Sequence, residues 1–151
     1  MKVAIIGGGI VGATCAYYLS KNKDIELTVF DYGVGQATKA SAGIISPWFS
    51  KRRNKPWYKM ARLGADFYLK LVQDLEAEGI NTNFYSQCGV YLLKKDEVKL
   101  PELKELAESR MELSPMIGEL KLLSKEEVQK VIPSFDNNGD VLYASGGGRV
   151  E

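Results

Sequence analysis

Three glycines near the start of the chain, Gly7, Gly9 and Gly12, have the spacing of a phosphate-binding turn. They follow an apolar, β-branched run at residues 2–6 and open a helical run at residues 10–22. Gly7 is expected to allow a tight turn, Gly9 to leave room for a pyrophosphate, and Gly12 to let the helix pack closely on the strand. Backbone N–H groups at the helix N-terminus then face the phosphates, where an anion gains about 0.3–1 kcal/mol. The pattern predicts a dinucleotide site built from backbone.

An acidic residue, Asp31, ends a second apolar run at residues 25–30, nineteen residues after Gly12. A carboxylate at this place accepts hydrogen bonds from both hydroxyls of an adenosine ribose and repels a 2′-phosphate. NADP is therefore disfavoured, whereas NAD and FAD both fit the pattern. The alternative interpretations are a tight loop without a ligand and, for Asp31, a structural cap.

The segment after Asp31 favours a flavin over a nicotinamide. Residues 36–47 read QATKASAGIISP, a run of small side chains and hydroxyls that would admit a flat ring. A flavin needs a long tract of backbone beside its ribityl chain and its ring system. A nicotinamide site on this fold usually continues directly to another strand and helix.

Four motifs together resemble the D-amino-acid oxidase superfamily of FAD-dependent oxidoreductases. They are GGGIVG at residues 7–12, the acid that ends the second strand, TKASAGII at 38–45 and LSKEEVQKVIP at 123–133. Glycine oxidase and the amino-acid dehydrogenase branch are the members most similar to the chain. The likeness spans nearly all 151 residues, and the specific motifs lie in the first forty-five.

The resemblance implies a set of FAD-binding residues. These are Ile6, Gly7, Gly9, Ile10, Val11, Gly12, Asp31, Tyr32, Thr38, Ser41, Ala42, Gly43, Ile44 and Ile45. Asp31 stands where the family more often has glutamate, and Gln36 and Lys39 stand where arginine and serine are frequent. For Thr38 and Ser41 the alternative role is an ordinary turn or helix cap.

The expected fold class is α/β: a Rossmann-like FAD-binding βαβ unit with a three-layer, mostly parallel sheet, followed by part of an α+β substrate domain. Residues 1–79 are expected to form the first part of the FAD-binding domain, and residues 80–151 an incomplete substrate domain. A helix is predicted at 56–78, with an apolar stripe expected to pack in the core rather than to bind a ring. The stripe consists of Trp57, Met60, Ala61, Gly64, Phe67, Tyr68, Leu71, Val72 and Leu75.

The second part of the chain is expected to alternate short strands and helices. Strands are predicted at 83–86, 89–93, 119–123 and 140–144, with helices at 100–111 and after a capping box of Ser124 and Glu127. Residues 146–148, three glycines, are expected to form a flexible turn. The resemblance places Cys88, Gly89 and Tyr91 near the flavin; otherwise their role is structural.

The activity that the resemblance implies is oxidation of an amino acid or secondary amine by hydride transfer to flavin N5. The chain is then the N-terminal fragment of such an enzyme, because the family continues past the final Val-Glu, and no catalytic residue is assigned within it. The missing C-terminal half would supply the arginine and tyrosine that grip an amino-acid carboxylate. The isolated chain is therefore expected to be inactive and to retain flavin weakly.

Two alternatives stay open. One is an FAD-dependent dehydrogenase of a hydroxy acid or glycerol phosphate that shares this N-terminal half. The other is a catalytically inactive, truncated nucleotide-binding remnant.

Composition limits the other function classes. Twenty basic and nineteen acidic residues leave a net charge of +1, which offers no field for nucleic acid or an anionic membrane. The absence of histidine removes the usual imidazole base and zinc ligand, and no metal site is expected. Two cysteines, Cys15 and Cys88, are too few for a disulfide framework and are expected to be reduced.

No apolar run approaches the ~18 residues of a membrane helix, and no signal peptide is recognised. A cytoplasmic location is expected, peripheral to the inner membrane if the parent enzyme passes electrons to quinone. A parallel sheet without neighbouring strands leaves apolar surface uncovered, so self-association is expected.

A basic cluster follows the small-residue segment and consists of Lys51, Arg52, Arg53 and Lys55. One interpretation is a solvated loop. The other is a lip near the active-site entrance that attracts carboxylates.

Overall fold

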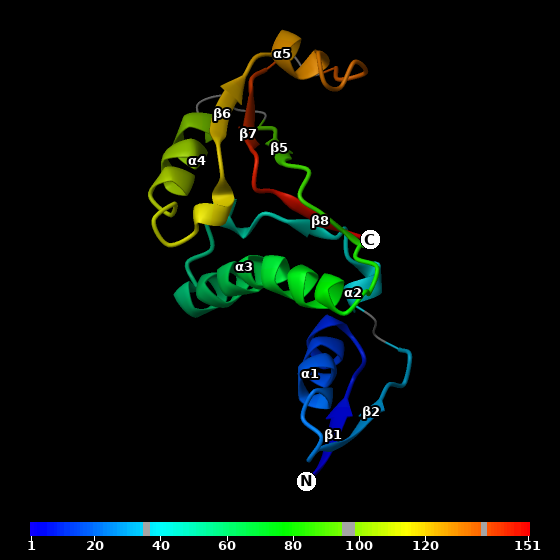
Figure 1. Cartoon of the computed structure of the whole chain (residues 1–151). Coiled ribbons are helices and arrows are strands. Elements are labelled where there is room, and N and C mark those ends of the chain that lie inside the picture. Colours follow the sequence, from blue (N-terminus) through cyan, green and yellow to red (C-terminus); the bar gives the residue numbers. More distant parts are fainter. Residues whose placement is uncertain (35–36, 95–98, 137–138) are drawn as a thin grey trace. The chain divides into compact units, whose positions relative to one another are not determined.

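The computed structural model describes residues 1–34, 37–94, 99–136 and 139–151. The chain divides into two compact units, unit 1 (Met1–Gly43) and unit 2 (Ile44–Glu151) (Figure 1). This division differs from the domain boundary at residues 79 and 80 expected for the complete enzyme, which stays a prediction.

Among the described residues, unit 1 contains four elements and unit 2 contains eleven. Those of unit 1 are β1 (Lys2–Ile6), α1 (Ile10–Ser20), β2 (Glu26–Phe30) and α2 (Ala37–Ala40). Those of unit 2 are β3 (Ile44–Ile45), η1 (Pro47–Phe49), α3 (Lys55–Ala77), β4 (Tyr85–Ser86), β5 (Val90–Leu92), α4 (Lys99–Glu108), η2 (Pro115–Ile117), β6 (Leu120–Leu123), α5 (Lys125–Gln129), β7 (Val141–Ala144) and β8 (Gly148–Val150).

Unit 1 is a strand–helix–strand unit with parallel strands, as the sequence predicts. β1 pairs with β2 in a register that runs from Lys2 opposite Glu26 to Ile6 opposite Phe30. The Gly7 N–H extends the ladder by donating to the Phe30 carbonyl at 2.7 Å. The two strands therefore end side by side, and the residues that follow each of them meet at one edge.

Unit 2 contains two antiparallel three-stranded sheets, in the orders β3-β8-β4 and β5-β7-β6. Its predicted strands are present with shorter bounds, α3 is shifted by one residue from the predicted 56–78, and α4 begins and ends earlier than the predicted 100–111. Within the described residues, parallel pairing is confined to β1 and β2. In Figure 1, α3 runs beside the sheet that contains β8.

The core of unit 2 forms where η1, α3, α4 and β7 meet. Fully buried Trp48 of η1 packs in one cluster with Leu100 and Leu103 of α4 and Leu142 of β7. Arg110 completes this region with its guanidinium, which donates to the Trp48 carbonyl and, at 3.1 Å, to the Ser50 carbonyl. The side chain also lies over the Tyr58 ring, 4.0 Å from the centroid. Arg110 thereby fixes the chain segment that follows η1.

The apolar stripe of α3 departs from its expected role as core. Ala65 and Leu71 are buried, but Met60 is 71% exposed and Trp57 is 36% exposed. The buried cluster around η1 and α4 reaches only the middle of the helix, at Ala65. The first turns of α3 therefore present apolar side chains to a pocket and to solvent.

The three glycines at 146–148 are also different from the expected flexible turn. All three are buried, and Gly148 is the first residue of β8. A Cβ on Gly146 would lie 1.5 Å from the Met116 carbonyl oxygen. The chain at Gly146 therefore passes the backbone of Met116 at a distance that leaves no room for a side chain.

The capping box at α5 is confirmed, with Ser124 Oγ accepting from Glu127 N–H and the Glu127 carboxylate accepting from Ser124 N–H.

Candidate functional site

The glycine bend of unit 1 has the tight geometry expected of it. Gly7 has a φ of +99°, a conformation that side chains with a Cβ rarely adopt. A Cβ on Gly12 would lie 1.9 Å from the Gly7 carbonyl oxygen. The first turn of α1 therefore rests directly on the bend, and only glycine at position 12 permits this approach.

The N-terminus of α1 offers backbone donors. Gly9 is the N-cap residue, and Ile10 N–H donates to Thr38 Oγ1 at 3.2 Å. In the described part of the chain, no hydrogen bond uses the N–H of Gly9 or Val11. These donors and the positive end of the helix dipole suit an anion.

A pocket of about 340 Å³ lies against this bend. Its lining residues are Gly7, Gly8, Gly9, Asp31, Val34, Ala37, Thr38 and Lys39. A second pocket, of about 550 Å³, shares Gly7, Gly9 and Thr38 with the first and is otherwise lined by Ile5, Ile6, Ile10, Val11, Gly12, Cys15 and Leu19. The first pocket joins the helix N-terminus to Asp31, which is the combination that an adenosine diphosphate requires.

Asp31 also stabilises the bend itself. Its Oδ2 accepts from Gly8 N–H at 2.9 Å, and its Oδ1 accepts from Gly33 N–H at 2.8 Å. These two bonds, that of Gly33 first, hold the pKa of the Asp31 carboxyl below its ordinary value. The group is therefore an exposed carboxylate, and each oxygen keeps a lone pair that a ribose hydroxyl can use. The capping role and the ribose role are compatible.

Gly8 is a residue whose importance sequence reasoning missed. A Cβ at this position would lie 2.6 Å from Asp31 Oδ2, so a side chain here would displace the carboxylate from its present contact with the bend. A glycine between Gly7 and Gly9 is the sequence feature that could have indicated this contact, although the G-x-G-x-x-G motif leaves that position unspecified.

The small-residue segment divides between the two units. Thr38, Ser41, Ala42 and Gly43 belong to unit 1, whereas Ile44 and Ile45 form β3 of unit 2. Thr38 contacts the bend through Ile10, and Ser41 Oγ donates to the Thr38 carbonyl at 2.9 Å, which is the turn role considered as its alternative. Gln36 lies outside the described residues.

The remaining candidate residues do not line the pocket that contains Asp31. Tyr32 is 91% exposed and lines none of the pockets described here, whereas Ile6, Ile10 and Val11 line the pocket of about 550 Å³. Gly89 donates its N–H to the Gly147 carbonyl, and the Tyr91 ring lies 4.9 Å from that of Tyr143. These contacts give Gly89 and Tyr91 structural roles at β5.

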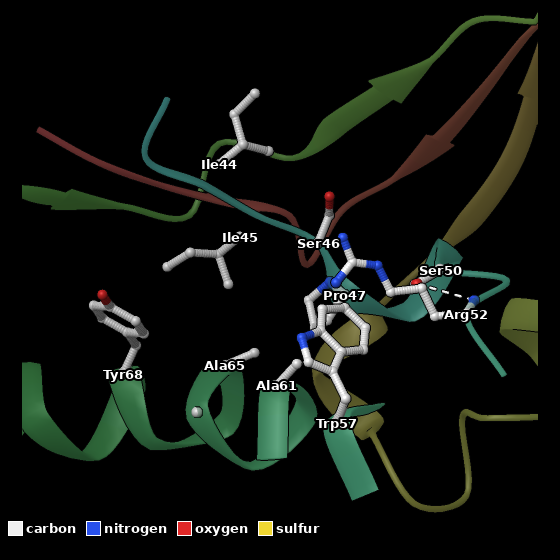
Figure 2. A pocket seen from close by; sticks show the side chains of 11 residues that line it. Ile44, Ile45, Ser46, Pro47, Ser50, Arg52, Trp57, Ala61, Ala65 and Tyr68 are labelled. Atoms are coloured by element: carbon white, nitrogen blue, oxygen red, sulfur yellow. Dashed lines mark hydrogen bonds between the residues drawn. The ribbon is translucent and has the colours of Figure 1, made fainter. Parts of the chain in front are cut away.

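Unit 2 has its own pocket, of about 570 Å³, between β3 and the first turns of α3 (Figure 2). Its walls are Ile44, Ile45, Ser46, Pro47, Ser50, Arg52, Trp57, Ala61, Gly64, Ala65 and Tyr68. Figure 2 shows Tyr68 at one end, and Arg52 with Trp57 at the other. The pocket thus shares one wall with the strand that the family resemblance places along the flavin.

The two ends of this pocket differ in chemistry. The Tyr68 ring stacks on Tyr85 with centroids 5.5 Å apart, and burial raises the pKa of the Tyr68 hydroxyl, which therefore stays protonated at neutral pH. At the opposite end the Arg52 guanidinium lies over the Trp57 ring, 4.5 Å from its centroid. Sequence reasoning missed this pocket because it assigned Trp57 and Tyr68 to the core.

The described residues contain no cluster of three or more Cys, Asp or Glu side chains that could hold a metal ion. Within the same residues, no helix combines the length and the apolar character needed to cross a bilayer.

Comparison with known proteins adds a family match. The sequence model of the family described as FAD dependent oxidoreductase (DAO) matches residues 2–151. The chain is 40% identical to the uncharacterized oxidoreductase YurR of Bacillus subtilis (strain 168), over 97% of this chain and 39% of YurR. It is 31% identical to glycerol 3-phosphate dehydrogenase of Caloramator mitchellensis, over 98% of this chain and 30% of that protein.

A solved structure gives a similar result. The crystal structure of iminodiacetate oxidase (IdaA) from Chelativorans sp. BNC1 matches with a TM-score of 0.87 and 28% identity, over 99% of this chain and 40% of the oxidase. The chain therefore spans two fifths or less of the length of these three proteins.

Proposed function

Because this chain belongs to the FAD dependent oxidoreductase (DAO) family, we propose that it is the part of an amine or amino-acid oxidoreductase that binds the FAD. The observation that carries this proposal is the juxtaposition, within unit 1, of free N–H groups at the start of α1 and the carboxylate of Asp31. The two groups fit the diphosphate and the ribose of an adenosine diphosphate.

The residues have separate roles in this proposal. The bend from Gly7 to Gly12 holds the pyrophosphate, and Asp31 holds the adenosine ribose. Thr38 holds the bend in place through Ile10, and the segment through Ile45 lies along the flavin. FAD supplies the chemistry when bound, as the acceptor of a hydride from the substrate carbon beside nitrogen.

The likeness to iminodiacetate oxidase supports an amine substrate. A second candidate is oxidation of glycerol phosphate or a hydroxy acid, which the 31% identity to a glycerol 3-phosphate dehydrogenase supports. A third is an inactive nucleotide-binding chain. Since the relatives are more than twice as long, we expect the isolated chain to retain FAD weakly and to have no turnover.

Nucleotide titration of the chain tests the site. Adenosine diphosphate, the half of FAD expected at the bend, should shift the backbone amide resonances of residues 7–12 in an NMR titration. Adenosine 5′-diphosphate that carries an additional 2′-phosphate should bind about tenfold more weakly, because Asp31 repels its 2′-phosphate. Asp31→Asn should weaken adenosine diphosphate binding about tenfold, since a charged hydrogen-bond acceptor is lost.

Asp24→Asn provides the matched control, because Asp24 lies in unit 1 away from the lining of the bend pocket. It should leave adenosine diphosphate affinity within twofold of the parent chain. Absence of saturable shifts at residues 7–12, or equal affinity for both nucleotides, would contradict the proposed site.

Self-association is a further part of the proposal. Ile6, Val11 and Phe30 are exposed on unit 1, with 81% of Ile6 accessible. Exposed apolar side chains beside unpaired strand edges support association between copies. Sedimentation velocity should give a mass above 16.7 kDa that rises with concentration, and a constant monomer mass would contradict this.

A further inference from the structure

The polar side chains of the unit 2 pocket are unevenly distributed. Figure 2 shows Trp57 at one end of the pocket and Tyr68 at the other. The serine and arginine side chains of the lining, those of Ser46, Ser50 and Arg52, lie toward the Trp57 end. The walls between the two ends are isoleucine, proline, alanine and glycine residues. An occupant with a polar group at the Trp57 end therefore directs its apolar part toward Tyr68.

Tyr68 closes its end of the pocket with a ring that is held in place. The ring stacks on Tyr85 of β4, with centroids 5.5 Å apart and planes 10° from parallel. Tyr85 is not among the residues that line the pocket, so it lies behind the Tyr68 ring as seen from the pocket. Because burial raises the pKa of the Tyr68 hydroxyl, the ring carries no charge at neutral pH. The end wall is therefore a neutral aromatic ring with a partner behind it.

Tyr85 is itself enclosed. It lies opposite Val150 in the pairing of β4 with β8. A Cβ on Gly148 would lie 3.2 Å from Tyr85 Cε2, so the Tyr85 ring lies against the backbone of β8. The Tyr85 hydroxyl oxygen is buried. Tyr68 therefore cannot retreat from the pocket by pushing Tyr85 aside without disturbing the β3-β8-β4 sheet.

We propose that Tyr68 limits the length of the apolar group that the pocket of unit 2 accepts. This inference rests on the proposed function, because the substrate must reach the segment through Ile45 that is proposed to lie along the flavin, and Ile45 is a wall of this pocket. It narrows the substrate to one whose apolar group fits between Trp57 and Tyr68.

The length available to that group follows from the helix. Trp57 and Tyr68 both belong to α3 and are eleven residues apart, roughly 16 Å at an α-helical rise of about 1.5 Å per residue. The two side chains occupy part of this length. A group that outgrows the remainder must displace Tyr68 from Tyr85 or extend into solvent, and neither adds favourable burial.

A series of 1-alkanols from 1-butanol to 1-nonanol tests the proposal on the full chain, because each member adds one methylene to the same polar group. The indole N–H resonance of Trp57 in an NMR titration gives the Kd, since Trp57 lines the pocket. Each buried methylene should lower the Kd about fourfold. In the parent chain this gain should stop before 1-nonanol, at a limiting chain length that meets Tyr68.

Tyr68→Ala should remove this limit, so that the Kd continues to fall through 1-nonanol. Tyr68→Leu should give a limiting chain length between those of the parent and the alanine variant. Tyr68→Phe should keep the limit of the parent, since it retains the ring that stacks on Tyr85. An unchanged indole resonance of buried Trp48 shows that the core of each variant is intact. If the alanine variant alters that resonance, Tyr68→Leu decides the test.

Tyr91→Ala is the matched control. Tyr91 also pairs with a second tyrosine ring, that of Tyr143 at 4.9 Å, but it lies outside the pocket lining. This variant should leave the limiting chain length unchanged.

Four outcomes would overturn the inference: no saturable shift of Trp57 with any alkanol, a gain that continues through 1-nonanol in the parent chain, the same limit in the alanine variant as in the parent, or a changed limit in Tyr91→Ala. A limit that moves in Tyr68→Phe would also overturn it, because the hydroxyl and not the ring would then set the length. Because adenosine diphosphate reports on unit 1 alone, failure here is distinct from failure of the proposed function.

Discussion

The glycine bend of unit 1 and the pocket of unit 2 suit anions by different means. The bend uses backbone N–H groups around residues 7–12. Among the described residues that line its pocket, Lys39 is the only one with a cationic side chain. The pocket of unit 2 uses one side chain, Arg52, held by a ring and a serine. A site made from backbone depends on where glycine permits close approach, whereas a site made from a side chain depends on what supports that side chain.

The largest expected effect is that of Gly12→Ala, which tests the backbone site. The new Cβ would meet the Gly7 carbonyl oxygen, so the bend must open at a cost of roughly 3 kcal/mol to unit 1. Native-state hydrogen exchange of the β1 and β2 amides should accelerate accordingly. Tryptophan fluorescence should be unchanged, because Trp48 and Trp57 both lie in unit 2.

Gly64→Ala is the control for this substitution. No atom lies within 4 Å of a Cβ at Gly64, and alanine is favoured over glycine in a helix by up to about 1 kcal/mol. This variant should therefore be as stable as the parent or slightly more stable. Equal stability of the Gly12 and Gly64 variants would contradict the account of the bend.

Next in size is Arg110→Ala, which tests the support of the side-chain site. It leaves the carbonyl oxygens of Trp48 and Ser50 without this donor and removes the guanidinium from the Tyr58 ring. Loss of a charged hydrogen-bond donor in a partly buried site should destabilise unit 2 by about 2 kcal/mol. Urea denaturation followed by tryptophan fluorescence measures this loss.

Arg53→Ala serves as the comparison, since an exposed arginine outside such contacts should change stability by less than about 0.5 kcal/mol. If both arginine variants unfold at the same urea concentration, Arg110 does not support the segment that carries Arg52.

The difference between the two sites explains how much of the molecule the sequence predicts. The parallel β1–α1–β2 unit, the turn at Gly7 and the close contact at Gly12 follow from local spacing, and the structure contains them. The capping box at Ser124 is local in the same sense. These features need no information about distant parts of the chain.

Features that depend on distant contacts were predicted less well. The close approach at Gly146 is to the Met116 carbonyl, thirty residues earlier in the chain. Because the local sequence does not reveal this contact, three consecutive glycines predict a flexible turn there. Trp57 has the spacing of a core residue, but the core cluster reaches α3 only at Ala65. Periodicity identifies the apolar face of a helix and cannot tell which part of that face is covered.

Thr38→Val should have a smaller effect, confined to the bend. It removes the oxygen that accepts from Ile10 N–H at 3.2 Å and retains the shape of the side chain. We expect a loss of about 1 kcal/mol and faster exchange of the Ile10 amide by roughly fivefold. Ser41→Ala, which removes only a bond within the α2 turn, should leave the Ile10 amide unchanged. Faster exchange in the Ser41 variant instead would show that the turn, and not Thr38, holds the bend.

The smallest effect concerns pH. Hydrogen bonds from Gly33 and then Gly8 lower the pKa of Asp31 in the folded chain, so its carboxylate stabilises the bend at pH values above the ordinary carboxyl pKa, about 3.9. This contribution should be constant from pH 5 to 8 and should be lost as pH falls through the lower folded value. Amide exchange of Gly8 and Gly33 between pH 3 and 6, corrected for intrinsic rates, would detect it. Loss of protection already near pH 6 would contradict the lowered pKa.

The pairing of β3 with β8 has a consequence for how the chain folds during synthesis. Ile45 lies opposite Gly148, about one hundred residues later, whereas the strands of unit 1 are joined by a single helix. Contacts between distant residues form more slowly than local ones. Unit 1 can therefore acquire its strand pairing while the ribosome is still adding the residues that β3 requires as its partner. β3, which forms one wall of the unit 2 pocket, can therefore pair only after the segment that contains β8 has emerged.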